Sequence, residues 1–240
     1  MLRIFTDFDG PIMDVSERYY QVYQYCLDKL QEPAQPLTVL SKDAFWQLKR
    51  AQVPERQIGR ISGLHDDQAR QFAVLRRETV HADPFLKHDR LIPGAVNALE
   101  QLQALEYHLV VVTMRRAHTL NAALSDHHLE GFFPPEVRYC IPDDYVKTHD
   151  TVEKTRLIEK ALTELPEACS AWMIGDTEAD ISAAQAHEVP VVAVLSGIRD
   201  RERLASCKPN FIVENLQAAI ATITSQIPLT DAMNSVPTDD

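Results

Sequence analysis

The chain opens on Leu2-Arg3-Ile4-Phe5-Thr6-Asp7-Phe8-Asp9-Gly10-Pro11, a short apolar run that ends in two carboxylates and a Gly-Pro break. The run predicts a buried strand over residues 2–7. Charged groups at the end of a buried strand are costly unless a cation lies between them. A divalent metal would meet that need, and the two carboxylates could then divide the work of a nucleophile and a proton carrier.

Length, composition and charge limit the classes of protein that fit. With 240 residues, 45% of them apolar, the chain can form one large domain or a core with a smaller insert. It has neither an apolar stretch of about 20 residues nor the features of a secretory signal, so we expect a cytoplasmic protein without membrane contact. Its four cysteines form no Cys-x-x-Cys pair, which argues against structural zinc and a disulfide framework. A net charge of −11 argues against a general nucleic-acid binder but allows a small anionic substrate.

Helical spacing dominates the middle of the chain, and strands alternate with helices on its C-terminal side. The pattern predicts helices over 16–27, 41–51 and 66–80, without a strand among them. Beyond Pro93-Gly94, apolar runs alternate with helical segments, which is typical of a doubly wound parallel sheet. We therefore predict an α/β fold in three parts: a core at 1–14 and 91–228, an all-helical cap at 15–90 and a disordered tail at 229–240.

Polar residues follow three of the predicted strands. Asp7 and Asp9 follow the first run, Thr113 and Arg115 follow the run at 109–112, and Gly175-Asp176-Thr177 follows the run at 171–174. In an open parallel sheet, ligands bind outside the carboxyl ends of the strands. Three segments that deliver polar groups to one edge predict a carboxylate-rich ligand site there.

These segments resemble, in order, the four motifs of the haloacid dehalogenase-like (HAD) superfamily. The matching residues are Asp7-Phe8-Asp9-Gly10, Thr113 after a valine run, a lysine that opens a helix, and Gly175-Asp176-Thr177-Glu178-Ala179-Asp180. The resemblance covers residues 1 to about 225 and is greatest to the phosphoglycolate-phosphatase-like branch, which has a helical cap after the first motif. It implies a Rossmann-like core, a Mg²⁺ cofactor and phosphate-ester hydrolysis.

The resemblance also implies a role for each motif residue. Asp7 would attack phosphorus to form an aspartyl-phosphate, and Asp9 would protonate the leaving oxygen and then activate water. Magnesium would be held by the Asp7 carboxylate, the Asp9 main-chain carbonyl and Asp176, with Asp180 supporting the metal directly or through water. The phosphoryl group would be bound by Thr113 and Lys154, with Lys147 as the rival lysine.

A basic stretch in the predicted cap leaves two interpretations open. Residues 49–64 carry four cations and two glycines. The stretch is either a mobile loop that offers Lys49, Arg56 or Arg60 to a substrate carboxylate or second phosphate, or an ordinary solvated helix–loop junction. Arg115, where relatives often carry a small residue, is a further candidate for binding a substrate anion.

Together these features predict a magnesium-dependent phosphomonoester hydrolase that acts on a small phosphorylated metabolite. A phosphoglycolate-like substrate follows from the resemblance alone. The alternatives are a phosphomutase of the same superfamily and a non-catalytic metabolite-binding protein on the same fold. The expected partner is the small metabolite, with neither nucleic acid nor membrane, and the sequence leaves monomer and homodimer open.

Overall fold

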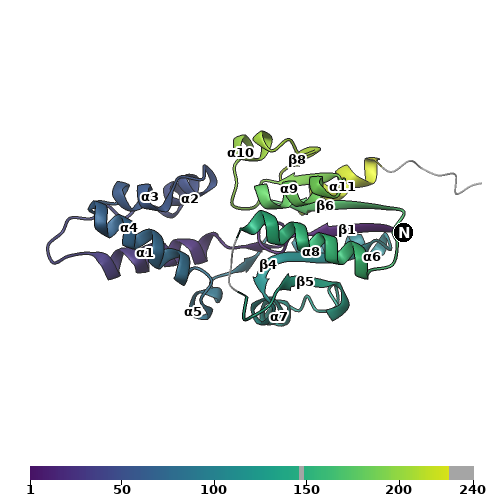
Figure 1. Ribbon diagram of the computed structural model, residues 1–240, viewed down its shortest axis with the longest axis horizontal. Helices are drawn as coiled ribbons and strands as arrows, with labels where there is room; N and C mark the ends of the chain where they lie inside the picture. Colours follow the sequence, from purple (N-terminus) through teal and green to yellow (C-terminus); the bar gives the residue numbers. More distant parts are fainter. Residues whose placement is uncertain (146–148, 227–240) are drawn as a thin grey trace, which may run out of the picture.

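A computed structural model describes residues 1–145 and 149–226 of the chain (Figure 1). Lys147 and the predicted tail at 229–240 lie outside these residues. The core is a six-stranded sheet in the order β5-β4-β1-β6-β7-β8, with every neighbouring pair parallel. This arrangement confirms the predicted doubly wound α/β fold. The strands are β1 (Leu2–Thr6), β4 (His108–Arg116), β5 (Arg138–Ile141), β6 (Ser170–Gly175), β7 (Val191–Val194) and β8 (Phe211–Val213).

Helices cover both faces of the sheet. The connections β1 to β4 and β6 to β7 run in opposite directions along the sheet, so right-handed crossovers place their helices on opposite faces. Accordingly α6 packs beside α11, and α8 packs beside α9. Val110, Val111 and Val112 in β4 are fully buried, which explains the continuous apolar run. The core helices are α6 (Ala95–Ala104), α7 (Ala117–Asp126), α8 (Asp150–Glu164), α9 (Glu178–Ala186), α10 (Arg201–Ser206) and α11 (Leu216–Gln226).

The helical cap lies beside the sheet, at the end opposite the N-terminus (Figure 1). It has its own hydrophobic cluster, in which the Tyr23 ring stacks on Phe45 at 4.6 Å between centroids and meets Phe72 edge-on at 6.1 Å. These aromatic contacts hold the helices of the cap together. The helices are α1 (Ser16–Leu30), α2 (Lys42–Arg50), α3 (Glu55–Ile61), α4 (Asp66–Thr79) and α5 (Asp83–Leu86).

The structure places helix α3 where the mobile-loop interpretation expected a loop, so that interpretation of residues 49–64 is wrong over 55–61. Gly59 indicated a loop in the sequence, but in α3 it is a close-packing position. A Cβ there would lie 3.3 Å from side-chain atoms of Leu64 and Phe72. Ile58, which precedes it, is fully buried.

Several contacts join the cap to the core. The two chain crossings form a small antiparallel ribbon, β2 (Met13–Asp14) with β3 (Arg90–Leu91), which the sequence did not predict. At a distance from it, the Arg50 guanidinium at the end of α2 donates to the main-chain carbonyls of Leu195 and Arg199, at 2.9 and 3.1 Å. Across the described ranges, no helix combines the length and apolarity that a membrane crossing requires.

Candidate active site

Four predicted site residues meet at the carboxyl edge of the sheet. Asp7 follows β1, Thr113 lies in β4, Lys154 lies in the first turns of α8, and Asp176 follows β6. All four line one cavity of about 110 Å³, to which Asp9 and Arg115 also contribute. The parallel strands end together at this edge, so segments far apart in the sequence deliver their polar groups to the same point.

Lys154 lies between two carboxylates. Its Nζ is 2.5 Å from Asp7 Oδ2 and 2.5 Å from Asp180 Oδ1, and its side chain is 1% exposed. Burial by itself would lower the pKa of Lys154. The carboxylates of Asp180 and Asp7 outweigh burial and raise this pKa above its ordinary value. The other oxygen of Asp180 accepts from the main-chain amides of Asp176 and Thr177 and from the Thr177 hydroxyl. Asp180 therefore both caps α9 and anchors the lysine.

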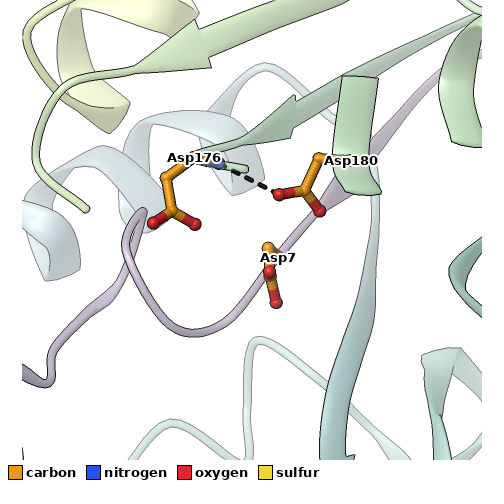
Figure 2. Close-up of side chains that lie close together, drawn as sticks. All are labelled: Asp7, Asp176 and Asp180. Carbon is orange, nitrogen blue, oxygen red and sulfur yellow. Dashed lines mark hydrogen bonds between the residues drawn. The ribbon is translucent and has the colours of Figure 1, made fainter. Parts of the chain in front are cut away.

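Figure 2 shows three buried carboxylates close together, those of Asp7, Asp176 and Asp180. Oxygens of Asp7, Asp176 and Asp180 lie within 4.8 Å of one another. When all three carboxylates are ionised, one lysine leaves two negative charges uncompensated. In this cluster burial, with repulsion from Asp180 and Asp7, therefore raises the pKa of Asp176 well above its ordinary value. Burial also dominates at Asp7, where it outweighs Lys154 and raises the pKa to about 7. Hard oxygen donors with two excess negative charges fit a divalent cation such as Mg²⁺.

Two glycines let the main chain approach Asp176 closely. A Cβ at Gly10 would lie 2.2 Å from Asp176 Cγ, and one at Gly197 would lie 1.9 Å from Asp176 Oδ2. Gly10 also has φ of 96°, a conformation that favours glycine. The Ile198 amide donates to Asp176 Oδ2 at 2.6 Å. The loops after β1 and β7 therefore fix the position of this carboxylate.

Asp9 belongs to a separate cluster of charges. Its Oδ1 accepts from Arg115 at 2.7 Å and its Oδ2 accepts from Arg18 at 3.0 Å. Both arginines also pair with Asp89, so two carboxylates and two guanidinium groups form a closed ring. Burial opposes the charge on Asp9, but Arg115 and Arg18 outweigh it and lower its pKa to about 2. Asp9 is therefore held ionised.

Comparison with known proteins places this geometry in a family. The family described as Haloacid dehalogenase-like hydrolase matches residues 4–194, most of the chain. The chain belongs to the haloacid dehalogenase-like hydrolase family. The sequence resemblance to this family is thereby confirmed.

Relatives within the haloacid dehalogenase-like hydrolases are distant in sequence. Pyrophosphatase PpaX of Oceanobacillus iheyensis is 26% identical over 140 residues, which span 57% of this chain and 63% of that protein's length. Pyrophosphatase PpaX of Listeria monocytogenes is 23% identical over 220 residues, 92% of this chain and 95% of that protein. A crystal structure of a predicted phosphoglycolate phosphatase from Haemophilus somnus superposes with a TM-score of 0.63 at 20% identity, and the match covers 92% of this chain and 97% of that one. At this identity the superposition shows the shared fold.

Three residues predicted to bind substrate in this haloacid dehalogenase-like chain have carboxylate partners. Arg115 pairs with Asp9 and Asp89, so its role toward a substrate anion stays a prediction. Arg56 and Arg60 lie on the exposed side of α3 and pair with Asp66. Neither is among the residues that line the cavity beside Asp7, so the geometry does not support a role for them in binding substrate.

Sequence reasoning missed Arg18 and Asp89. Arg18 lies four residues before Val22 and eight before Cys26, on the stripe of α1 that is buried. An arginine on an apolar stripe is a signal that could have been found, because a fully buried guanidinium needs carboxylate partners. Asp89 precedes β3 in an irregular polar segment and carries no comparable local signal.

Proposed function

We propose that this haloacid dehalogenase-like hydrolase is a magnesium-dependent phosphohydrolase that acts on a small phosphorylated metabolite through an aspartyl-phosphate. The observation that carries the proposal is the cluster of three buried carboxylates around one lysine at the carboxyl edge of the sheet. Asp7, Asp176 and the Asp9 main-chain carbonyl would hold Mg²⁺, and Asp180 would support it. When bound, Mg²⁺ would neutralise these carboxylates and the charge on the phosphoryl oxygens.

Asp7 is the proposed nucleophile. Its Oδ1 accepts the Phe8 main-chain amide at 2.6 Å and its Oδ2 contacts Lys154, so the carboxylate is fixed in position. An Asp7 oxygen would form a bond to phosphorus while the bond from phosphorus to the leaving oxygen breaks. Lys154 and the Thr113 hydroxyl would bind the transferred phosphoryl group, and positioning and charge would supply most of the rate.

Asp9 is the proposed proton carrier, and its arginine contacts define how it acts. A carboxylate held ionised at neutral pH suits the second step, in which Asp9 accepts a proton from the water that attacks phosphorus and frees Asp7. To protonate the leaving oxygen in the first step, Asp9 would have to move from Arg18 and Arg115 and take up a proton. The contacts of Asp9 with Arg18 and Arg115 would therefore have to break before Asp9 could act as the acid of the first step.

Two substrate classes have separate support. The resemblance of the motifs points to a phosphoglycolate-like monoester, and the two relatives carry the name Pyrophosphatase PpaX, which points to pyrophosphate. Both are small phosphates with a second anionic group.

The test is phosphate release with Mg²⁺ from a panel of phosphorylated metabolites, pyrophosphate and an aryl phosphate. We expect turnover that Asp7→Asn reduces on the order of 10³-fold or more, while Asp43→Asn, on the exposed side of α2, leaves it unchanged. Acid quenching during turnover should leave a phosphate on the peptide that contains Asp7. Wild-type turnover by Asp7→Asn would refute the mechanism, and formation of a sugar bisphosphate without net phosphate release would identify a mutase instead.

A further inference from the structure

A second cavity of about 270 Å³ lies between the cap and the core. It adjoins the cavity that contains Asp7, because Tyr19, Thr177 and Ile198 line both. Lys49 and Arg76 belong to its cap wall. We call this space the cap subsite.

Lys49 and Arg76 bring excess positive charge to the cap subsite. Their side chains are 11% and 7% exposed, and both pair with one carboxylate, that of Glu55. The Arg76 Nη1 lies 2.7 Å from Glu55 Oε1, while its Nε and Nη2 are buried and have no hydrogen-bond acceptor among the described residues. Two cations against one carboxylate leave one positive charge that is largely removed from water.

The aromatic ring of Tyr19 holds these cations at the wall. The Arg76 guanidinium carbon lies 4.7 Å from the centre of the ring, and Lys49 Nζ lies 5.9 Å from it. Burial, with added repulsion from Arg76 and Arg199, lowers the pKa of Lys49 to about 8 although Glu55 opposes the change. An anion in the cavity would relieve this repulsion and favour the charged lysine.

The core side of the cap subsite is less positive. Arg199 is paired with Glu178 at 2.8 Å, and Asp150 lines the same cavity. The contact of Arg50 with the carbonyls of Leu195 and Arg199 fixes the end of α2 against the core, next to Lys49. The positive charge therefore lies on the cap wall, and the cap is positioned over the space beside Asp7.

We propose that the cap subsite binds the second anionic group of a substrate whose phosphoryl group lies on Asp7, so that the substrate is a short phosphate compound with an oxyanion at its far end. The inference rests on the proposed function and extends it to the substrate. A carboxylate and a second phosphate share the chemistry that Lys49 and Arg76 recognise.

The first test measures binding of non-hydrolysable phosphonates by calorimetry in the presence of Mg²⁺. Phosphonoacetate and methylenediphosphonate, with homologues one methylene longer, carry a carboxylate or a phosphonate at the far end, and ethylphosphonate carries no second charge. We expect at least one doubly anionic probe to bind roughly tenfold to a hundredfold more tightly than ethylphosphonate. The tightest probe identifies the type of anion and the spacing. Equal affinities for all probes would overturn the proposal.

The second test uses Arg76→Met and Lys49→Met. Each variant leaves Glu55 paired with the remaining cation, and Arg76→Lys keeps the charge. Both methionine variants should lose most of the preference for the doubly anionic probe and keep the affinity for ethylphosphonate, while Arg76→Lys should restore part of the preference. Arg70→Met, an exposed arginine on the same helix, is the matched control and should change neither affinity. A preference that survives in both methionine variants would refute the role of these residues.

The kinetic result separates this inference from the proposed function. Arg76→Met should lower kcat/KM for a doubly anionic substrate through KM and leave the aryl phosphate nearly unaffected. An equal loss on both substrates would show a structural role and overturn the inference, although the phosphohydrolase proposal would stand. Wild-type turnover by Asp7→Asn would refute the phosphohydrolase mechanism, whatever the subsite binds.

Discussion

Replacing Arg115 by glutamine tests the charge ring that holds Asp9. The Arg115 side chain is 4% exposed and contacts both Asp9 and Asp89. In Arg115→Gln the carboxylates of Asp9 and Asp89 would share Arg18 alone, which changes the ring from neutral to one negative charge. Removing one partner from a buried ion pair typically costs about 3–5 kcal/mol of the free energy of unfolding.

The dependence of this loss on pH identifies its electrostatic part. The pKa of Asp9 is lowered from 3.8 to about 2 in the folded protein, which corresponds to about 2 kcal/mol of stability. Because the folded pKa is lower than the unfolded one, this contribution is present above pH 3.8 and is lost as the pH falls toward 2. Arg115 lowers the pKa of Asp9 more than any other group does. Without Arg115 the folded pKa of Asp9 would be closer to the unfolded value, so the variant would lose less stability in acid.

The assay is urea unfolding with a metal chelator, followed by circular dichroism at about pH 7 and about pH 3. We expect the difference between wild type and Arg115→Gln to be largest near neutral pH and to shrink by up to about 1 kcal/mol at about pH 3, because with a folded pKa of about 2 only about half of the contribution is lost there. Arg116→Gln is the control, because the Arg116 guanidinium donates to the main-chain carbonyl of Tyr145, and its effect should stay near 1 kcal/mol at both values. Two results would refute this role of the ring: Arg115→Gln lowers the free energy of unfolding by less than about 1 kcal/mol at neutral pH, or it lowers it by the same amount at both pH values.

Three further changes test other parts of the structure. Lys154→Met should lower turnover more than about 100-fold and, with a metal chelator present, lower the free energy of unfolding by about 3–5 kcal/mol; near-normal turnover would contradict the proposed phosphate contact. Gly197→Ala should raise the Mg²⁺ concentration for half-maximal turnover about tenfold or more, because its Cβ would overlap the Asp176 carboxylate. Gly131→Ala is the control, because a Cβ there would meet open space. The same Mg²⁺ dependence in both variants would contradict a role of Gly197 in placing the Asp176 carboxylate. Tyr23→Phe removes a buried hydroxyl with two hydrogen-bond partners and should cost about 1–2 kcal/mol in urea unfolding without changing turnover of an aryl phosphate, so a kinetic effect would be unexpected.

The cap shows where local sequence patterns were insufficient. Helical spacing predicted α1, α2 and α4, because each presents an apolar stripe long enough to detect. It did not identify α3, which has seven residues and contains a glycine. That glycine allows the close approach of Phe72 from α4, a contact between helices that no local pattern contains.

The sequence by itself determined the succession of the buried strands along the chain and which polar residues follow them. Because parallel strands end at one edge, this order was enough to predict that Asp7, Thr113 and Asp176 lie together. Only the tertiary structure showed which charged groups lie next to one another. It pairs Asp9 with Arg115, 106 positions away, and it brings Arg76 and Lys49 of the cap to a cavity beside Asp7. Such contacts depend on how helices and strands from distant parts of the chain pack, and side-chain periodicity within one element carries no information about them.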